Sequence, residues 1–205
     1  MTESVFVLEA LSWLERLRIG RLLKKYRGCK ILVLGSKGVG KSTYLDQLET
    51  DGIITDPHSP TIARNPKKFQ AYLDQGPMTI KTEDVGGETS QWPHWIDVLS
   101  ENKPVGIIFL IDHRFPSRHI SALNFLRTSL SSRKRRCKFI LFLVNKYDVW
   151  HKDTSFNDIL ENYHEELGKF RHLKIAVISD YCSAKTGERV KSTLSTVLSR
   201  FIWYY

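Results

Sequence analysis

The sequence predicts an α/β domain, a six-stranded and mostly parallel sheet with helices on both faces. Strand-like apolar runs alternate with helical patterns along most of the chain, and short glycine-rich or polar motifs follow several of these runs. The chain of 205 residues, with 41% apolar and 26% charged residues, is long enough for one substantial core. We expect the strands at residues 29–34, 68–74, 78–84, 105–111, 139–144 and 174–179.

Two local patterns refine this topology. The runs 68–74 and 78–84 are separated only by Gln75, Gly76 and Pro77, which is too short for a parallel crossover and predicts an antiparallel hairpin. The last helix should place one apolar stripe against the sheet, because its apolar residues recur at helical spacing. That stripe consists of Val190, Leu194, Val197, Leu198, Phe201 and Ile202.

The first expected strand leads directly into a phosphate-binding loop, GSKGVGKS at residues 35–42, and a helical segment follows it. The glycines let the backbone curl so that its N–H groups converge on a β-phosphate. Lys41 can place its charge on the β- and γ-phosphates, and Ser42 can offer its hydroxyl to Mg²⁺. The residues expected to bind a nucleoside triphosphate here are Lys37, Gly38, Val39, Gly40, Lys41, Ser42 and Thr43.

A second motif, Asn145-Lys146-Tyr147-Asp148, follows the strand at 139–144 and predicts guanine. The carboxylate of Asp148 can accept from both guanine N1–H and the 2-amino group. Adenine lacks these donors, so an ATP complex would leave the carboxylate unpaired at a cost of about 1–3 kcal/mol. After the strand at 174–179, the backbone N–H of Ala184 can reach guanine O6. The expected base-binding residues are Asn145, Lys146, Asp148, Ser183, Ala184 and Lys185.

A third motif, Asp84-Val85-Gly86-Gly87-Glu88, is followed by Pro93 and Trp95, and Pro60-Thr61 precedes it. With these three motifs the chain resembles a small GTPase of the Ras superfamily, and most closely its Arf/Sar branch. The resemblance covers residues 28–205 and implies a P-loop NTPase G domain. Residues 1–27 would then form an N-terminal amphipathic helical extension.

The resemblance also implies how the third motif acts. Ser42 and Thr61 would bind Mg²⁺ directly, Asp84 would bind it through water, and the N–H of Gly87 would contact the γ-phosphate. Thr55 is the nearest competitor of Thr61, but it lacks the preceding proline. Core packing is the commoner fate of a single tryptophan, and by its spacing alone Trp95 is the one that we expect to contact an effector.

Glu88 departs from the family pattern, which has glutamine at this position. Glu88 and Lys41 are the expected catalytic residues for the conversion of GTP to GDP and phosphate. An ionised glutamate can only accept hydrogen bonds, and at ~5 Å and a dielectric of ~20 it repels each phosphate charge by about 3 kcal/mol. Glu88 should therefore swing away, take up a proton or pair with a base such as Arg64 or Lys67. We expect slow hydrolysis.

Two functions remain open. The first is a GTP-binding switch that recruits effectors in its GTP state and is served by exchange-factor and GTPase-activating proteins. The second is a hydrolysis-deficient, GTP-bound docking or assembly subunit. Turnover with and without an activator would separate them.

The N-terminal extension has an apolar face between Phe6 and Leu17. The Arf resemblance implies that it docks on the G domain with GDP and is released to a membrane with GTP. A helix permanently packed on its own G domain is the equal alternative. Thr2 stands where myristoylation needs glycine, so membrane binding would depend on the helix itself.

The net charge of +9 does not by itself indicate nucleic acid, because no nucleic-acid motif accompanies it. The basic run at 133–136 is explained by a solvated connector. Cys29, Cys137 and Cys182 lie in or beside expected buried strands, which predicts core side chains in a reducing compartment. We expect a cytoplasmic protein, with any membrane contact peripheral and on the cytosolic face.

Overall fold

The computed structural model describes residues 29–50, 53–54, 65–73, 76–102, 104–131 and 137–202. The predicted N-terminal extension, residues 1–27, lies outside these residues. The strands are β1 (Cys29–Leu34), β2 (Asn65–Leu73), β3 (Gly76–Asp84), β4 (Gly106–Asp112), β5 (Phe139–Asn145) and β6 (Ala176–Tyr181). The helices are α2 (Lys41–Glu49), α3 (Trp92–Asn102), α4 (Pro116–Ser131), α5 (Phe156–Glu161), α6 (His164–Arg171) and α7 (Val190–Ile202). Two 3₁₀ turns complete the order, η1 (Thr89–Gln91) and η2 (Tyr147–Val149).

The six strands form one sheet in the order β2-β3-β1-β4-β5-β6. Only β2 and β3 pair antiparallel, and the other neighbours are parallel. The predicted mixed sheet is thereby confirmed. The predicted turn was too long, because β3 begins at Gly76, which pairs with Leu73. The expected sixth strand began two residues early, since β6 begins at Ala176.

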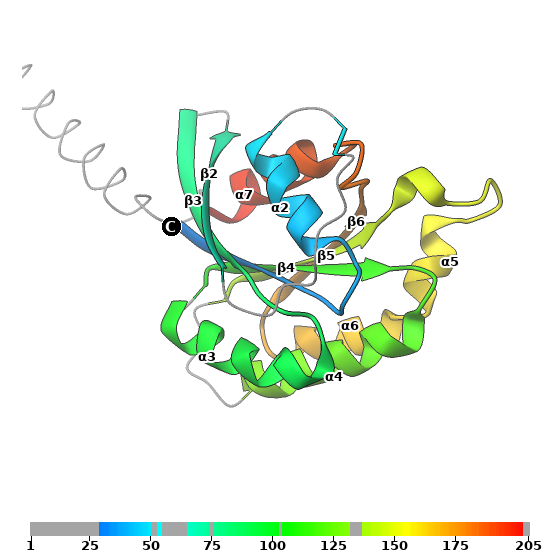
Figure 1. Ribbon diagram of the computed structural model, residues 1–205. Coiled ribbons are helices and arrows are strands. Elements are labelled where there is room, and N and C mark those ends of the chain that lie inside the picture. The colour runs from blue at the N-terminus through cyan, green and yellow to red at the C-terminus, as the bar shows by residue number, and fades with distance from the viewer. Residues whose placement is uncertain are drawn as a thin grey trace, which may run out of the picture.

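Helices cover both faces of the sheet (Figure 1). On one face, Ile31 and Val33 of β1 pack with residues of α2 and α7. On the other, Leu32 and Leu34 pack with residues of α3, α4 and α6. All residues of β4 and β5 are buried, because these central strands are covered on both faces. That burial explains why their sequences are continuous apolar runs rather than alternating ones.

The predicted stripe of α7 forms part of this core. Val190, Leu194, Val197 and Leu198 are at most 4% exposed, and Phe201 packs beside them. All three cysteines are free and buried, and burial raises the pKa of the Cys29 and Cys137 thiols to about 12. They therefore act as apolar core side chains. Within the described ranges, no helix has the length and apolar character needed to cross a membrane.

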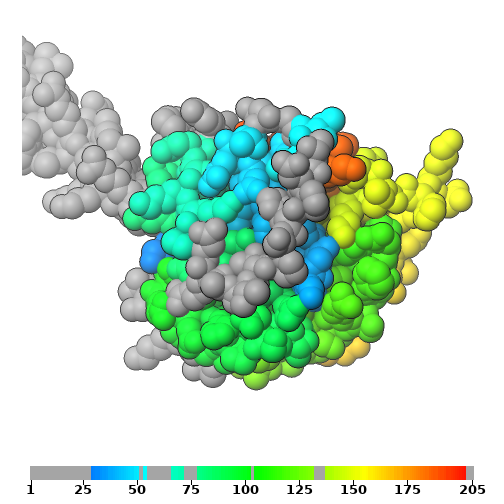
Figure 2. Space-filling view, in the orientation of Figure 1, coloured from blue at the N-terminus to red at the C-terminus, as the bar shows by residue number. Residues whose placement is uncertain are grey.

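One segment stands out from the compact body. The chain between β5 and α5 protrudes in the space-filling view, where it is yellow (Figure 2). This segment includes the last three residues of the guanine motif, and Tyr147 and Val149 within it are 37% and 49% exposed. The protruding segment therefore adjoins the predicted base site.

Candidate functional site

The three predicted motifs meet at one edge of the sheet. The phosphate-binding loop follows β1, the Asp84 motif follows β3, and the Asn145 motif ends β5. The segment containing Ser183 and Ala184 follows β6. All four strands end at this edge because they run parallel, and open α/β sheets bind ligands there.

The phosphate-binding loop needs glycine for both its backbone angles and its neighbours. Gly35, Gly38 and Gly40 have φ values of 146°, 78° and 90°. A Cβ at Gly35 would lie 2.4 Å from the carbonyl O of Leu110, and one at Gly40 would lie 2.5 Å from Asn145 Nδ2. The loop ends at the N-terminus of α2, where the cap residue is Gly40. Such a helix end presents backbone N–H groups to an anion.

Lys41 lies in the wall of this loop and is only 7% exposed. Its Nζ donates to the carbonyl oxygens of Gly35 and Ser36, both at 3.1 Å. Burial lowers the pKa of the Lys41 ammonium to about 8, although the Asp84 carboxylate acts in the opposite direction. A bound phosphate would stabilise the charged form, so the lysine is suited to an anionic ligand.

Ser42 and Asp84, two of the predicted metal ligands, are in direct contact. Ser42 Oγ donates to Asp84 Oδ2 at 2.6 Å, and Asp84 is 3% exposed at the end of β3. A hydroxyl and a carboxylate held together beside a phosphate-binding loop are the hard oxygen ligands that suit Mg²⁺. These residues therefore fit that ion. Thr61 and its competitor Thr55 lie outside the described residues.

Asn145 joins the base-binding motif to the phosphate-binding loop. Its Nδ2 donates to the carbonyl O of Val39 at 2.8 Å, and its Oδ1 accepts from the backbone N–H of Ala184 at 2.8 Å. The N–H that was predicted to reach guanine O6 is therefore already engaged, and base binding must share or replace that bond. Asp148 Oδ1 accepts from Ser183 Oγ at 2.6 Å, which orients the carboxylate predicted to recognise guanine.

Lys146 is held by a carboxylate, Asp112, that was not among the residues predicted from the sequence. Its Nζ donates to the carbonyl O of Gly38 and to Asp112 Oδ2, both at 2.8 Å, and its φ is 67°. Arg114 forms a fork on the same carboxylate, with Nε 2.9 Å from Oδ1 and Nη2 2.7 Å from Oδ2. Burial would raise the pKa of Asp112, but the hydrogen bonds from Arg114 and Lys146 hold it well below its usual range.

A buried histidine, His119, links the end of β4 at Asp112 to the phosphate-binding loop. His119 Nδ1 lies 3.2 Å from Ser36 Oγ. His119 Nε2 lies 3.1 Å from the backbone N and 2.9 Å from the backbone O of Asp112. Burial lowers the pKa of His119 to about 4 against the raising effect of its hydrogen bond with the Asp112 backbone, so the ring is neutral at pH 7.

Asp112 could have been found from the sequence. It is a polar residue that ends an apolar strand at the sheet edge that carries the motifs.

Comparison with known proteins agrees with this geometry. The ADP-ribosylation factor family matches residues 17–201. The chain belongs to this family. ADP-ribosylation factor-like protein 2 of Drosophila melanogaster is 28% identical over 87% of this chain and 90% of its own length. ADP-ribosylation factor-like protein 3 of Chlamydomonas reinhardtii is 31% identical over 63% and 69% of the two chains. The small COPII coat GTPase SAR1 of Giardia intestinalis is 29% identical over 58% of each.

The protein is therefore a small GTPase of the Arf/Sar branch and a GTP-binding switch of the Arf type. Arf-family GTPases bind GTP and GDP, typically with Mg²⁺, and hydrolyse GTP.

Glu88, which stands where the Arf family pattern has glutamine, forms an ion pair with Lys37 of the phosphate-binding loop. The pair joins residues 51 positions apart in sequence. Of the two partners predicted, Lys67 pairs with Asp46 of α2 instead, and Arg64 lies outside the described residues. Of the three alternatives predicted for Glu88, the structure therefore shows pairing with a base. The base is Lys37 rather than Arg64 or Lys67.

Two tryptophans hold the backbone just before Glu88. Trp95 Nε1 donates to the carbonyl O of Gly86 at 3.0 Å, and Trp92 Nε1 donates to that of Gly87 at 3.3 Å. Trp95 is fully buried, so its predicted role as a surface contact for an effector is wrong in this structure. A Cβ on Gly87 would lie 2.4 Å from Lys41 Nζ, which shows how closely this turn lies on the phosphate-binding loop.

Proposed function

We propose that this chain is an Arf-like switch that binds GTP and GDP with Mg²⁺, recruits effectors in its GTP state and hydrolyses GTP slowly. The observation that carries the slow rate is the ion pair between Glu88 and Lys37. It holds a glutamate against the phosphate-binding loop at the position where the family pattern has glutamine.

The nucleotide would be bound from two sides. The phosphate side comprises Lys37, Gly38, Val39, Gly40, Lys41, Ser42, Thr43 and the N–H of Gly87. The base side comprises Asn145, Lys146, Asp148, Ser183, Ala184 and Lys185. The proposal is supported by the contacts of Asn145 with Val39 and Ala184, which fix the two sides relative to each other.

Ser42 and Asp84 would hold Mg²⁺, with Thr61 as a further ligand. Bound Mg²⁺ would neutralise charge that develops on the β- and γ-phosphate oxygens. Lys41 would add a fixed positive charge at the same phosphates. Its burial supports this role, because a charge acts more strongly where water is excluded.

Glu88 would slow hydrolysis for two reasons. A carboxylate can accept a hydrogen bond from the attacking water but cannot also donate one, as the amide of glutamine can. It would also place a negative charge near the γ-phosphate. The repulsion between the carboxylate and each phosphate charge is about 3 kcal/mol at ~5 Å and a dielectric of ~20. Lys37 offsets only part of this repulsion, because both side chains are about half exposed, at 54% and 46%, and water screens the pair.

Two measurements test the proposed function. The first is multiple-turnover GTP hydrolysis with Mg²⁺, and the second is the competition of GTP or ATP with labelled GDP for binding. We expect GTP but not ATP to compete, with turnover that is slow and measurable. Equal competition by ATP would contradict the guanine assignment. Turnover as fast as that of a glutamine-bearing Arf-family protein would contradict the role of Glu88.

The same ion pair favours a second candidate, a GTP-bound docking or assembly subunit that does not turn over. Tight GTP binding without turnover, and without acceleration by any activating protein, would favour this subunit over the switch. An activator that restores turnover would favour the switch, because a partner can supply the missing water-positioning or arginine group.

The remaining parts of the proposal concern partners and location. Residues 28–205 would form the G domain, and residues 1–27 a helical extension that contacts a membrane surface in the GTP state. Effector, exchange-factor and GTPase-activating proteins would be its protein partners, and no nucleic acid is proposed. Liposome flotation of the protein with and without residues 1–20 tests the membrane contact. We expect that deletion of these residues abolishes flotation.

A further inference from the structure

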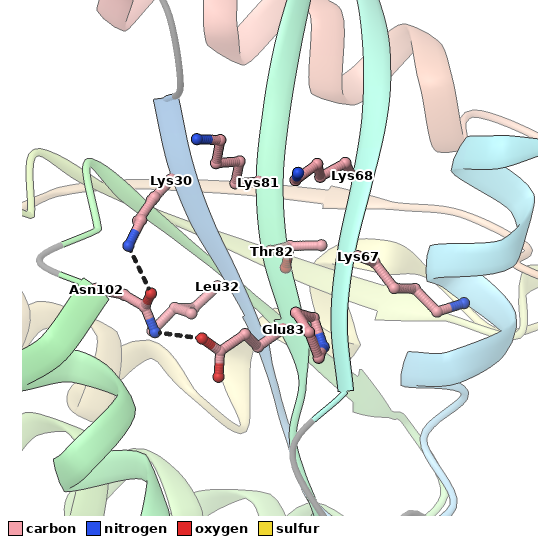
Figure 3. Close-up of a pocket in the computed structure, with 9 residues that line it drawn as sticks. Lys30, Leu32, Lys67, Lys68, Lys81, Thr82, Glu83 and Asn102 are labelled. Carbon is pink, nitrogen blue, oxygen red and sulfur yellow. Dashed lines mark hydrogen bonds between the residues drawn. The ribbon is translucent and has the colours of Figure 1, made fainter.

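Three lysines lie side by side on three neighbouring strands, away from the nucleotide residues. Lys68 of β2 is opposite Lys81 of β3, and Lys81 is also opposite Lys30 of β1. Residues in register point to the same face of a sheet, so the three form a row across it. We call Lys30, Lys68 and Lys81 the lysine row (Figure 3). Like charges directly opposite one another destabilise a sheet, so this row needs an explanation.

The lysine row lies on the face of β2 and β3 opposite to α2. Lys67, the next residue on β2, points the other way and pairs with Asp46 of α2. The row borders a hollow of about 460 Å³ beside the C-terminal end of α3. At that border Lys30 Nζ donates to Asn102 Oδ1 at 2.9 Å, and Asn102 Nδ2 donates to Glu83 Oε1 at 2.8 Å (Figure 3). The hollow is therefore basic on the sheet side and shaped by fixed polar groups at its edge.

Ordinary surface placement does not account for the whole row. Lysines on an edge strand deter pairing with other chains, and this explains Lys68 on the edge strand β2. Lys81 and Lys30 lie on interior strands, where no edge needs protection. Both Lys68 and Lys81 are exposed, and neither has an acidic partner among the residues that the structure describes. The repulsion between Lys68 and Lys81 is therefore not relieved by an ion pair within that part of the chain.

We propose that the lysine row docks an acidic segment of a partner protein. Neighbouring strands lie about 4.8 Å apart, so the row spreads its charges over about 10 Å, the length of roughly three residues of extended chain. The hollow beside it gives room for side chains. Glu83 at its border would repel a uniformly anionic surface such as a lipid bilayer, whereas a peptide carries N–H donors for a carboxylate. This surface goes beyond the switch, because it contains none of the proposed nucleotide or metal residues.

The test uses the full-length protein loaded with GDP and fluorescein-labelled hexaglutamate, with anisotropy measured at low ionic strength. Lys68→Gln with Lys81→Gln should weaken binding at least about 10-fold. The matched control, Lys152→Gln with Lys174→Gln, removes the same charge from two exposed lysines outside the lysine row and should leave affinity nearly unchanged. Equal losses in the two variants would overturn the proposal, and so would binding only to phosphatidylserine vesicles. The GDP content of each variant, measured separately, shows whether nucleotide binding is intact.

A single charge reversal separates docking from folding. Lys81→Glu replaces two repulsive cross-strand pairs with attractive ones, so the melting temperature should rise by about 2 °C. The same variant should lose hexaglutamate binding. A variant that is more stable and still binds hexaglutamate as well as the unmodified protein would overturn the proposal.

Discussion

At the scale of single residues, the site depends on charged groups that hold one another in place. Glu88 is held by Lys37, and Lys146 is held by Asp112 together with the carbonyl of Gly38. These contacts fix side chains that the family resemblance only assigns to positions in the sequence. The contact of Lys146 with Asp112 can be removed at Asp112, which is not one of the proposed nucleotide-binding residues.

Asp112→Asn tests the support of Lys146. The substitution removes the charge that Lys146 and Arg114 share, so Lys146 should lose its fixed position against the base. We expect GDP affinity to fall about 10-fold, or roughly 1.4 kcal/mol, in a fluorescent-nucleotide titration. Asp153→Asn, at an exposed turn after the guanine motif, is the control and should have no effect. Unchanged affinity of Asp112→Asn would show that Gly38 alone is enough to hold Lys146.

His119 predicts a pH dependence of stability. Burial lowers its pKa from the ordinary 6.5 to about 4 in the folded protein, so on acidification the unfolded chain takes up a proton first. Stability should therefore fall as the pH drops from about 6.5 towards 4, by about 2 kcal/mol between pH 7 and pH 5. His113, which is partly buried, also has a lowered pKa and contributes in the same direction, so the comparison must isolate His119. Urea unfolding of His119→Gln should show a clearly weaker fall over that range, and an identical fall would contradict the assignment.

At the scale of elements, the turn after β3 is held from behind by α3. The indole N–H of Trp92 donates to the carbonyl O of Gly87, and that of Trp95 donates to the carbonyl O of Gly86. Their rings contact Phe125 of α4, Trp92 in a tilted and Trp95 in an edge-on arrangement, at centroid distances of 5.6 and 6.1 Å. The turn that faces the phosphate-binding loop is thereby coupled to the aromatic core between α3 and α4.

Trp95→Phe tests this coupling. It removes the hydrogen bond to Gly86 and part of a fully buried ring, and should lower the free energy of unfolding by about 2–3 kcal/mol. Trp150→Phe is the matched control, because Trp150 Nε1 is buried without a hydrogen-bond partner in the described part of the chain. Trp150→Phe should lower the free energy of unfolding by clearly less than Trp95→Phe, as followed by circular dichroism. Equal costs would mean that the bond to Gly86 contributes nothing measurable.

Much of this element structure could be predicted from sequence. β4 and β5 are unbroken apolar runs because both their faces are buried, and the hairpin followed from a connection too short to cross over. The Lys37–Glu88 pair could not be predicted, because it joins two loops whose separation depends on the packing of the sheet. The position of Trp95 was misjudged because spacing identifies the residue but not whether its ring faces solvent or core.

At the scale of the whole molecule, nucleotide binding should be linked to global stability, because the site joins segments from four strands. GDP at about 100 times its dissociation constant should stabilise the protein by about 2.7 kcal/mol, a rise in melting temperature of roughly 5–10 °C. ATP should give no such rise. Chelation of Mg²⁺ should reduce the GDP effect, because Ser42 and Asp84 would hold that ion and the positive charge it supplies to the phosphates would be lost. An equal rise with ATP would contradict guanine selectivity.

We propose that Glu88, held by Lys37, sets the rate of GTP hydrolysis. The decisive measurement is single-turnover hydrolysis by the GTP-loaded protein beside the Glu88→Gln variant. We expect a rate at least about 10-fold higher in Glu88→Gln, which corresponds to a barrier lower by roughly 1.4 kcal/mol. The same rate in both proteins, with GTP bound equally well, would contradict it.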